Sequence, residues 1–123
     1  MNMYQKEGEY TPDALIASNE LPILKEGIGL KPGQGVLKRG TLISKGDDKA
    51  GYIAGKTDTG KLYGILTDDT DTGKDDTGDN IPSVCYLTGV FNPDAVTVYE
   101  GKNVEDYKDD LRSIGIYFRN VQG

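Results

Sequence analysis

Residues 84–95 read Val84-Cys85-Tyr86-Leu87-Thr88-Gly89-Val90-Phe91-Asn92-Pro93-Asp94-Ala95. The apolar and β-branched residues predict a continuous β run over residues 83–91, and Asn92-Pro93 predicts a turn that ends it. A second apolar strand is expected over residues 95–99. No side chain in this stretch suggests chemistry, so the stretch indicates a packed β core.

Downstream of this stretch the sequence predicts one short helix and a last strand. Asn103 is suited to cap the helix because its side chain can accept a backbone N–H of the first turn. Four residues then share one face at helical spacing: Val104, Tyr107, Lys108 and Leu111. Gly115 is expected to stop the helix, and residues 116–121 are expected to form the final strand.

Upstream, short apolar runs alternate with glycine-containing turns. Residues 27–30 fit a half-buried strand, and residues 31–35, Lys-Pro-Gly-Gln-Gly, fit a turn. Residues 55–60 are expected to form a hairpin loop between strands over residues 51–54 and 61–67. Turn signals recur about every eight to twelve residues, which is typical of a small barrel or sandwich. The sequence therefore predicts a mainly β domain with one short C-terminal α-helix.

The segment 68–80 contains no apolar residue and six aspartates, which predicts an exposed loop. A calcium loop of the helix-loop-helix type needs glycine at its sixth position and glutamate at its twelfth. Loops counted from Asp69, Asp71 or Asp75 all fail this pattern. A solvated loop is therefore the favoured interpretation, with loose binding of a divalent ion as the alternative and no assigned metal site.

The length, charge and apolar content of the chain argue against several classes of function. The chain of 123 residues has the length of one domain, and its net charge of −6 argues against nucleic-acid binding. No apolar run approaches the roughly 18 residues that a membrane-spanning helix needs. The single cysteine, Cys85, lies in an apolar run and is expected to be a small buried hydrophobe. We therefore expect a soluble protein made in a cytoplasm.

The sequence motifs that could indicate catalysis lack a required residue or the required surroundings. Residues 55–61 match seven positions of a phosphate-binding loop, but Leu62 stands where serine or threonine must bind magnesium. The carboxylate pairs Asp68–Asp69 and Asp109–Asp110 lack the apolar surroundings that would raise a pKa for acid–base work. Histidine is absent from the chain. The sequence therefore predicts a protein that is not an enzyme and uses no cofactor.

Several short motifs, taken in order, carry a resemblance to a known family. They are Pro12-Asp13-Ala14-Leu15-Ile16-Ala17, Leu37-Lys38-Arg39-Gly40-Thr41-Leu42, Tyr63-Gly64-Ile65-Leu66, Val84-Cys85-Tyr86-Leu87-Thr88-Gly89-Val90-Phe91-Asn92 and Leu111-Arg112-Ser113-Ile114-Gly115-Ile116-Tyr117. Together they resemble the head decoration protein family of tailed bacteriophages, of which the phage lambda head decoration protein is the familiar member. The resemblance covers residues 12–119.

The resemblance implies a small β-barrel or β-tulip-like (β-clip) domain over residues 12–123 that forms a homotrimer. It implies a structural role on the virion, outside the expanded capsid at three-fold sites, where the trimer stabilises the shell against DNA pressure. The implied partner is the major capsid protein, with no nucleic acid or membrane involved, and synthesis takes place in the bacterial cytoplasm. Residues 1–11 correspond to a flexible arm that contacts the capsid. Its candidate contact residues are Met3, Tyr4, Gln5, Lys6, Glu7 and Tyr10.

Two other functions stay open at the level of sequence. A carbohydrate- or cell-surface-binding β module could use exposed tyrosines and aspartates. A small hydrolase resembling the trimeric deoxyuridine triphosphatases would need nucleotide-binding motifs that we do not find in the sequence. The acidic segment 68–80 looks longer and more acidic than the decoration-protein pattern, and its role is left open.

Overall fold

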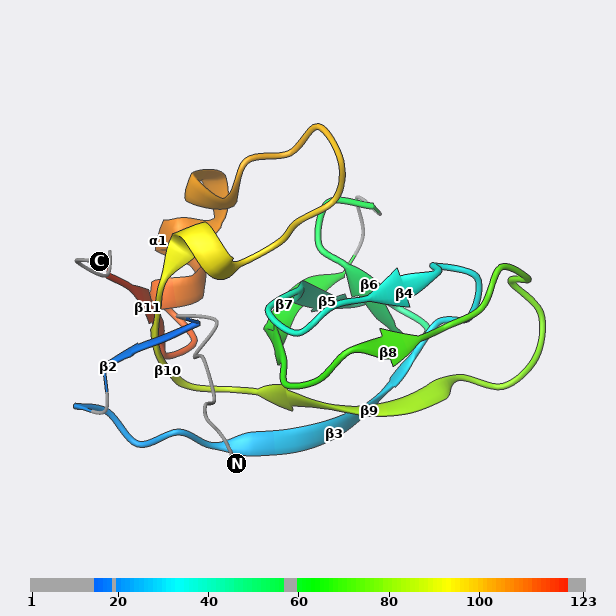
Figure 1. Ribbon diagram of the computed structural model, residues 1–123, viewed down its shortest axis with the longest axis horizontal. Helices are drawn as coiled ribbons and strands as arrows, with labels where there is room; N and C mark the ends of the chain where they lie inside the picture. The colour runs from blue at the N-terminus through cyan, green and yellow to red at the C-terminus, as the bar shows by residue number, and fades with distance from the viewer. Residues whose placement is uncertain (1–14, 19, 57–59, 120–123) are drawn as a thin grey trace, which may run out of the picture.

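The computed structural model describes residues 15–18, 20–56 and 60–119. Its main body is a closed five-stranded barrel with the strand order β3-β6-β5-β7-β9 (Figure 1). A three-stranded sheet, in the order β11-β10-β2, packs beside the barrel together with the one α-helix of the described residues, α1. The predicted mainly β fold, a small barrel with one short C-terminal helix, is confirmed.

The elements are short. The barrel strands are β3 (Lys25–Leu30), β5 (Leu42–Lys45), β6 (Gly51–Ile53), β7 (Lys61–Leu66) and β9 (Ile81–Tyr86). The three-stranded sheet contains β2 (Ile16–Ser18), β10 (Gly89–Phe91) and β11 (Ile116–Phe118), and a separate pair is formed by β4 (Val36–Leu37) and β8 (Thr70–Asp71). The helical elements are the 3₁₀ turns η2 (Pro93–Ala95) and η3 (Val104–Tyr107), and α1 (Lys108–Arg112).

Two hydrophobic cores share the strands β5, β7 and β9. Successive side chains of a strand point to opposite faces. Accordingly, the adjacent residues Leu42 and Ile43 of β5 belong to different cores, as do Ile65 and Leu66 of β7. The core inside the barrel contains Leu30, Leu37, Ile43, Leu66 and Cys85. The core between the barrel, the three-stranded sheet and α1 contains Leu15, Leu42, Ala54, Ile65, Tyr86, Phe91, Val96, Leu111 and Ile116.

The barrel closes at a seam between β3 and β6, which pair in parallel at Leu30 and Gly51. Gly51 has no side chain at this point, and a Cβ there would lie 2.8 Å from Cδ2 of Leu30. The amide of Gln34 fastens the seam: its Nε2 donates to the carbonyl oxygen of Gly51 at 3.1 Å, and its Oε1 accepts from the backbone N–H of Ile53 at 2.9 Å. The predicted turn at residues 31–35 thus supplies the side chain that closes the barrel.

The expected hairpin at residues 55–60 is wrong. The strands β6 and β7 flank this segment, but they do not pair with each other. Both are antiparallel to β5 and lie on its two sides, so β5 separates them. Sequence spacing alone suggested a hairpin because it shows two neighbouring strands and cannot show a third strand between them.

The expected strands around Asn92-Pro93 also need correction. The β run at 83–91 is interrupted after Tyr86, where the chain passes from the barrel into the three-stranded sheet. Residues 95–99 form no strand of their own. The backbone of Thr97 bonds to Gly40 and Leu42, whereas the N–H of Tyr99 donates to Ala54 at 2.9 Å. Because these bonds go to two different segments, no continuous ladder forms, and Asn92-Pro93 starts a 3₁₀ turn rather than joining two strands.

The C-terminal helix agrees with its sequence signals. Oδ1 of Asn103 accepts the N–H of Glu105 at 3.0 Å, and Leu111 is fully buried. Lys108 is exposed, and the first turn is 3₁₀ rather than α-helical. Gly115 has a φ of +96°, as expected at a helix stop. The following strand ends at Phe118, and residues 120–121 of the expected strand lie outside the described part.

The segment 68–80 is an exposed loop only in part. Residues 73–80 are exposed as expected, but β8 pairs with β4, and Thr72 is buried. The Thr72 hydroxyl donates to the carbonyl oxygen of Gly35 at 2.7 Å and accepts the N–H of Gln34 at 2.8 Å. These bonds to the 31–35 turn hold the start of the acidic segment against the barrel.

Gly64 should be essential to barrel closure. A Cβ at this position would collide with the carbonyl oxygen of Tyr86 and lie 3.0 Å from Cβ of Cys85, both in the neighbouring strand β9. We expect Gly64→Ala to lower the free energy of unfolding by about 1–3 kcal/mol, as overpacking does. Urea denaturation measures this change.

Gly27→Ala is the matched control. Gly27 also lies in a barrel strand, but an added Cβ would meet only the carbonyl oxygen of Ser83, at an ordinary 3.6 Å. This variant should be neutral, or more stable by about 0.5–1 kcal/mol, because alanine loses less backbone entropy than glycine. Equal stability of the two variants would contradict the role of Gly64.

Candidate functional site

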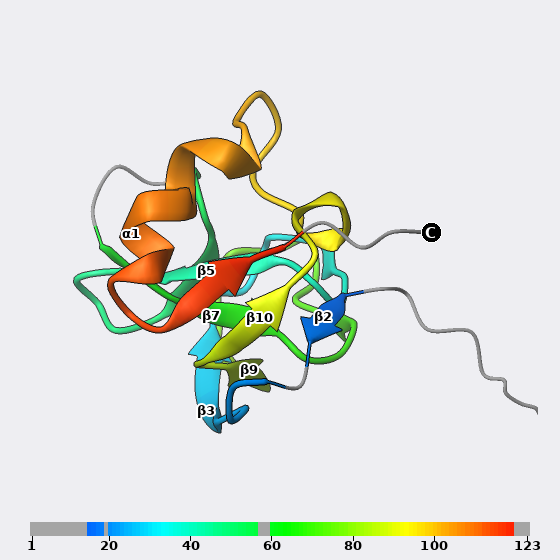
Figure 2. The same cartoon turned by 90° about the vertical axis from the view of Figure 1, so that its left-hand side faces the viewer.

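The two described ends of the chain meet on one strand. The backbone N–H of Asn92, directly after β10, donates to the carbonyl oxygen of Leu15 at 2.8 Å. The N–H of Arg119 donates to the carbonyl oxygen of Phe91 at 2.9 Å. Figure 2 shows β2, β10 and β11 side by side, with β10 between the other two. The strand β10 therefore fixes where both described ends lie.

Beside these ends lies a shallow hollow of about 410 Å³. It is lined by the residues that we call the chain-end surface: Glu20, Leu21, Val90, Tyr117, Phe118 and Arg119. Leu21 and Tyr117 are large apolar side chains with 38% and 39% of their surfaces exposed. Exposed apolar side chains that gather in one hollow are typical of a surface that binds another molecule.

An ion pair crosses the chain-end surface. The guanidinium of Arg119 donates to Oε1 of Glu20 at 2.7 Å. This hydrogen bond and the positive charge of Arg119 hold the pKa of Glu20 below its ordinary value. Both side chains are more than half exposed, so their pairing adds little to stability. The pair instead joins two segments that border the hollow and gives its edge one charge of each sign.

The chain-end surface has the chemistry of a binding surface. Its lining offers one carboxylate, one guanidinium, one phenol and apolar groups. The carboxylate is already paired with the guanidinium, so it is not poised as a free base. Within residues 15–18, 20–56 and 60–119, no three acidic, histidine or cysteine side chains gather so that they could hold a metal ion.

The candidate contact residues of the arm lie outside the described residues. They are Met3, Tyr4, Gln5, Lys6, Glu7 and Tyr10. The whole predicted arm, residues 1–11, precedes the first described residue, Leu15. Leu15 itself is bonded to Asn92, directly after β10.

The carboxylate pairs considered for catalysis lie in two different places. Oδ1 of Asp69 accepts the backbone N–H of Arg39 at 2.8 Å, and Oδ2 of Asp68 accepts the Thr67 hydroxyl at 3.0 Å. The residues Asp109 and Asp110 are exposed on α1. The first pair therefore forms hydrogen bonds that hold the start of the acidic segment, Asp68 to its neighbour Thr67 and Asp69 to the distant Arg39.

The segment that resembles a phosphate-binding loop does not have the required context. It is followed directly by the strand β7, whereas such a loop needs a helix after it. Its residues 57–59 lie outside the described part.

In the described part of the chain, no helix is long and apolar enough to cross a membrane.

No protein-family model matches the chain, and no curated protein matches it. The resemblance to head decoration proteins therefore stays a hypothesis that rests on the ordered sequence motifs. The sequence did not point to the chain-end surface, because its residues come from three distant segments that only the pairing of β10 brings together.

Cys85 is buried in the barrel core as the sequence predicted. Burial raises the pKa of its thiol from 9.0 to about 12. Because the thiolate is the reactive form, we expect the folded protein to react with Ellman's reagent at pH 8 far more slowly than the protein unfolded in urea. Similar rates in the two states would show that Cys85 is accessible.

The same shift predicts a pH dependence of stability. Above pH 9.0 the unfolded chain loses the thiol proton while the folded protein keeps it, so the free energy of unfolding falls as the pH approaches 12. The slope should be as steep as about 1.4 kcal/mol per pH unit for this one group. Comparison with Cys85→Ala isolates the contribution, because other groups that titrate in this range are common to both proteins. Parallel pH profiles would contradict the prediction.

Proposed function

We propose that this protein is a homotrimeric head decoration protein of a tailed bacteriophage. It is made in the bacterial cytoplasm and binds the outside of the expanded capsid at three-fold sites, where it stabilises the shell against internal DNA pressure. It acts by binding and not by catalysis, with the major capsid protein and its own copies as partners. The ordered sequence motifs support the family, and the small barrel is consistent with it.

The observation that carries the proposal is the convergence of the described chain ends on β10. The arm at residues 1–11 is the segment that the resemblance assigns to capsid contact, and Leu15 is the first described residue after it in the sequence. The backbone of Leu15 bonds to Asn92, directly after β10, and β10 supplies Val90 to the chain-end surface, where Leu21 and Tyr117 are exposed. We infer that the chain-end surface faces the capsid, so that the arm and this surface bind together.

A trimer also suits the physical properties of the domain. Its described elements include several strands of only two or three residues, and a small domain buries a limited fraction of its surface. Association of copies buries additional apolar surface and stabilises each fold by mass action. The net charge of −6 favours solubility and keeps the subunit from binding packaged DNA without specificity.

Removal of residues 1–11 should abolish capsid binding and leave the fold intact. Light scattering should give the full-length protein the mass of three 13.3 kDa subunits, and it should sediment with expanded capsids. The truncated protein should keep the thermal unfolding midpoint of the full chain but stay in the supernatant. A full-length protein that is strictly monomeric and ignores expanded capsids would refute the proposed function.

The role of the chain-end surface is tested by Tyr117→Asp. This variant places a charge among exposed apolar groups and should weaken capsid binding at least about tenfold, as expected for an anchor residue. Val36→Asp is the control, because Val36 is 53% exposed but lies in β4, outside the chain-end surface. Equal losses from both variants, or a loss from Val36→Asp alone, would place the binding face elsewhere.

A further inference from the structure

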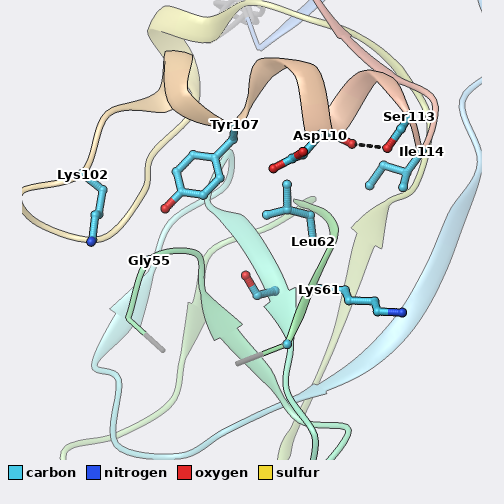
Figure 3. Close-up of a pocket in the computed structure, with 10 residues that line it drawn as sticks. Gly55, Lys61, Leu62, Lys102, Tyr107, Asp110, Ser113 and Ile114 are labelled. Atoms are coloured by element: carbon cyan, nitrogen blue, oxygen red, sulfur yellow. Dashed lines mark hydrogen bonds between the residues drawn. The ribbon is translucent and has the colours of Figure 1, made fainter. Parts of the chain in front are cut away.

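A second hollow, of about 460 Å³, lies between the C-terminal helix and the barrel. Its volume is in the range of small-molecule sites. Figure 3 shows side chains from the helical segment above it and from the barrel below it. Six side chains carry the argument that follows: Ser44, Leu62, Lys102, Tyr107, Asp110 and Ile114. Lys61 also borders the hollow, but it extends away from the other labelled side chains (Figure 3).

Ser44 gives the hollow an unpartnered polar group. The residue is only 7% exposed, and its hydroxyl makes no hydrogen bond to any described residue. The other buried polar residues are bonded through their side chains: Thr41, Thr67, Thr72 and Asn92. Buried hydroxyls in folded proteins are nearly always paired. The Ser44 hydroxyl is therefore available to a hydrogen-bonding partner that enters the hollow, either water or a ligand.

The position of Ser44 follows from strand alternation. Ser44 is two residues beyond Leu42 in β5 and so faces the same side as the core under the helix. Leu42 is covered by that core, whereas Ser44 borders the hollow. Ser44 therefore lies at the edge of the apolar core, and its hydroxyl lies at the floor of the hollow.

One side of the hollow presents hydrogen-bond donors. The Tyr107 hydroxyl and the Lys102 side chain both approach Gly55, where a Cβ would lie 3.0 Å from the Tyr107 oxygen and 2.7 Å from Cγ of Lys102 (Figure 3). Within the described residues, Lys102 forms no ion pair and the Tyr107 hydroxyl no hydrogen bond. Burial raises the pKa of Tyr107, so the phenol stays protonated at neutral pH and donates. The Lys102 ammonium and the Tyr107 hydroxyl can together bind the carboxylate of a ligand.

The other side presents an acceptor and an apolar wall. The carboxylate of Asp110 points toward Leu62 and has no hydrogen bond or ion pair with any described residue (Figure 3). Carboxylate oxygens accept hydrogen bonds from hydroxyl groups of a ligand. Leu62 is half-buried, and Ile114 is 38% exposed, so both can contact an apolar ligand face. A ligand in the hollow would therefore meet an ammonium, a carboxylate, a hydroxyl and an apolar surface.

We propose that this hollow binds an acidic sugar residue of the hexuronic acid class. Its carboxylate pairs with Lys102 and accepts from Tyr107, its ring hydroxyls bond to Ser44 and Asp110, and its apolar ring face packs on Leu62 and Ile114. A neutral sugar leaves the ammonium unpaired, and a simple organic acid gives the Asp110 carboxylate no hydroxyl donors. This binding goes beyond capsid decoration and does not depend on it.

Titration of the isotopically labelled full-length protein with D-glucuronate tests the proposal. Amide chemical shifts of Ser44, Leu62 and Asp110 should change and saturate in the millimolar range. D-glucose, acetate and inorganic phosphate serve as separate probes and should each bind at least tenfold more weakly. Absence of saturable shifts with glucuronate would overturn the proposal. Equal binding of acetate or phosphate would also overturn it, since the site would then recognise any anion.

Three variants separate binding from folding. Lys102→Met should weaken glucuronate binding at least tenfold, whereas Lys108→Met, which removes the same charge from an exposed residue outside the lining, should not. Ser44→Ala should weaken binding several-fold while it keeps or raises the thermal unfolding midpoint, because it removes an unpaired buried hydroxyl. A Ser44→Ala protein that binds glucuronate like the parent, or equal losses from the two lysine variants, would contradict the assignment.

Discussion

The fold depends on three barrel strands that are each buried on both faces over one pair of residues. In Leu42–Ile43 of β5, Ile65–Leu66 of β7 and Cys85–Tyr86 of β9, neighbouring residues supply different cores, so these pairs are apolar without the alternation of a surface strand. Cys85 faces the barrel interior and Tyr86 faces the second core, where its ring lies 5.6 Å from the ring of Phe91. Because one strand serves two cores, an error of one residue in its register would exchange side chains between the cores and disrupt the packing of both.

This arrangement determines which surfaces are left for function. The second core fixes β10 against the barrel, and β10 fixes both described chain ends through bonds from Asn92 and to Phe91. The same core covers Leu42 but stops before Ser44, which creates the hollow beside α1. The chain-end surface and the hollow are therefore both edges of one packed region. They lie on different elements, so the proposed capsid-binding surface and the proposed ligand site do not overlap.

The sequence was sufficient for features that depend on neighbouring residues. The cap at Asn103, the positive φ of Gly115 and the burial of Cys85 follow from local chemistry and apolar context. It was insufficient for features that depend on contacts between segments far apart in the sequence. Thr72 appeared to belong to a polar loop, but its hydroxyl has partners in the 31–35 turn. Residues 95–99 have strand composition, yet their hydrogen-bond partners are split between two segments.

For the same reason, the sequence did not predict which residues come together at the candidate sites. Asp110 was predicted to be an exposed helical carboxylate, and it is, but its proximity to the hollow depends on how α1 packs on the barrel. Ser44 has no sequence signal beyond a polar residue after an apolar pair. The chain-end surface joins residues near position 20, in β10 and in β11, and no local pattern connects them. The arm residues were identified from the resemblance alone.

The central claim is that packing around β10 makes the chain-end surface the binding face of the protein. Hydrogen–deuterium exchange of the capsid-bound and free protein tests this claim most directly. The account predicts that capsid binding slows exchange at residues 20–24 and 116–119 and leaves residues 73–80, on the acidic segment, unchanged. Slower exchange at residues 73–80, with no change at 20–24 and 116–119, would contradict it.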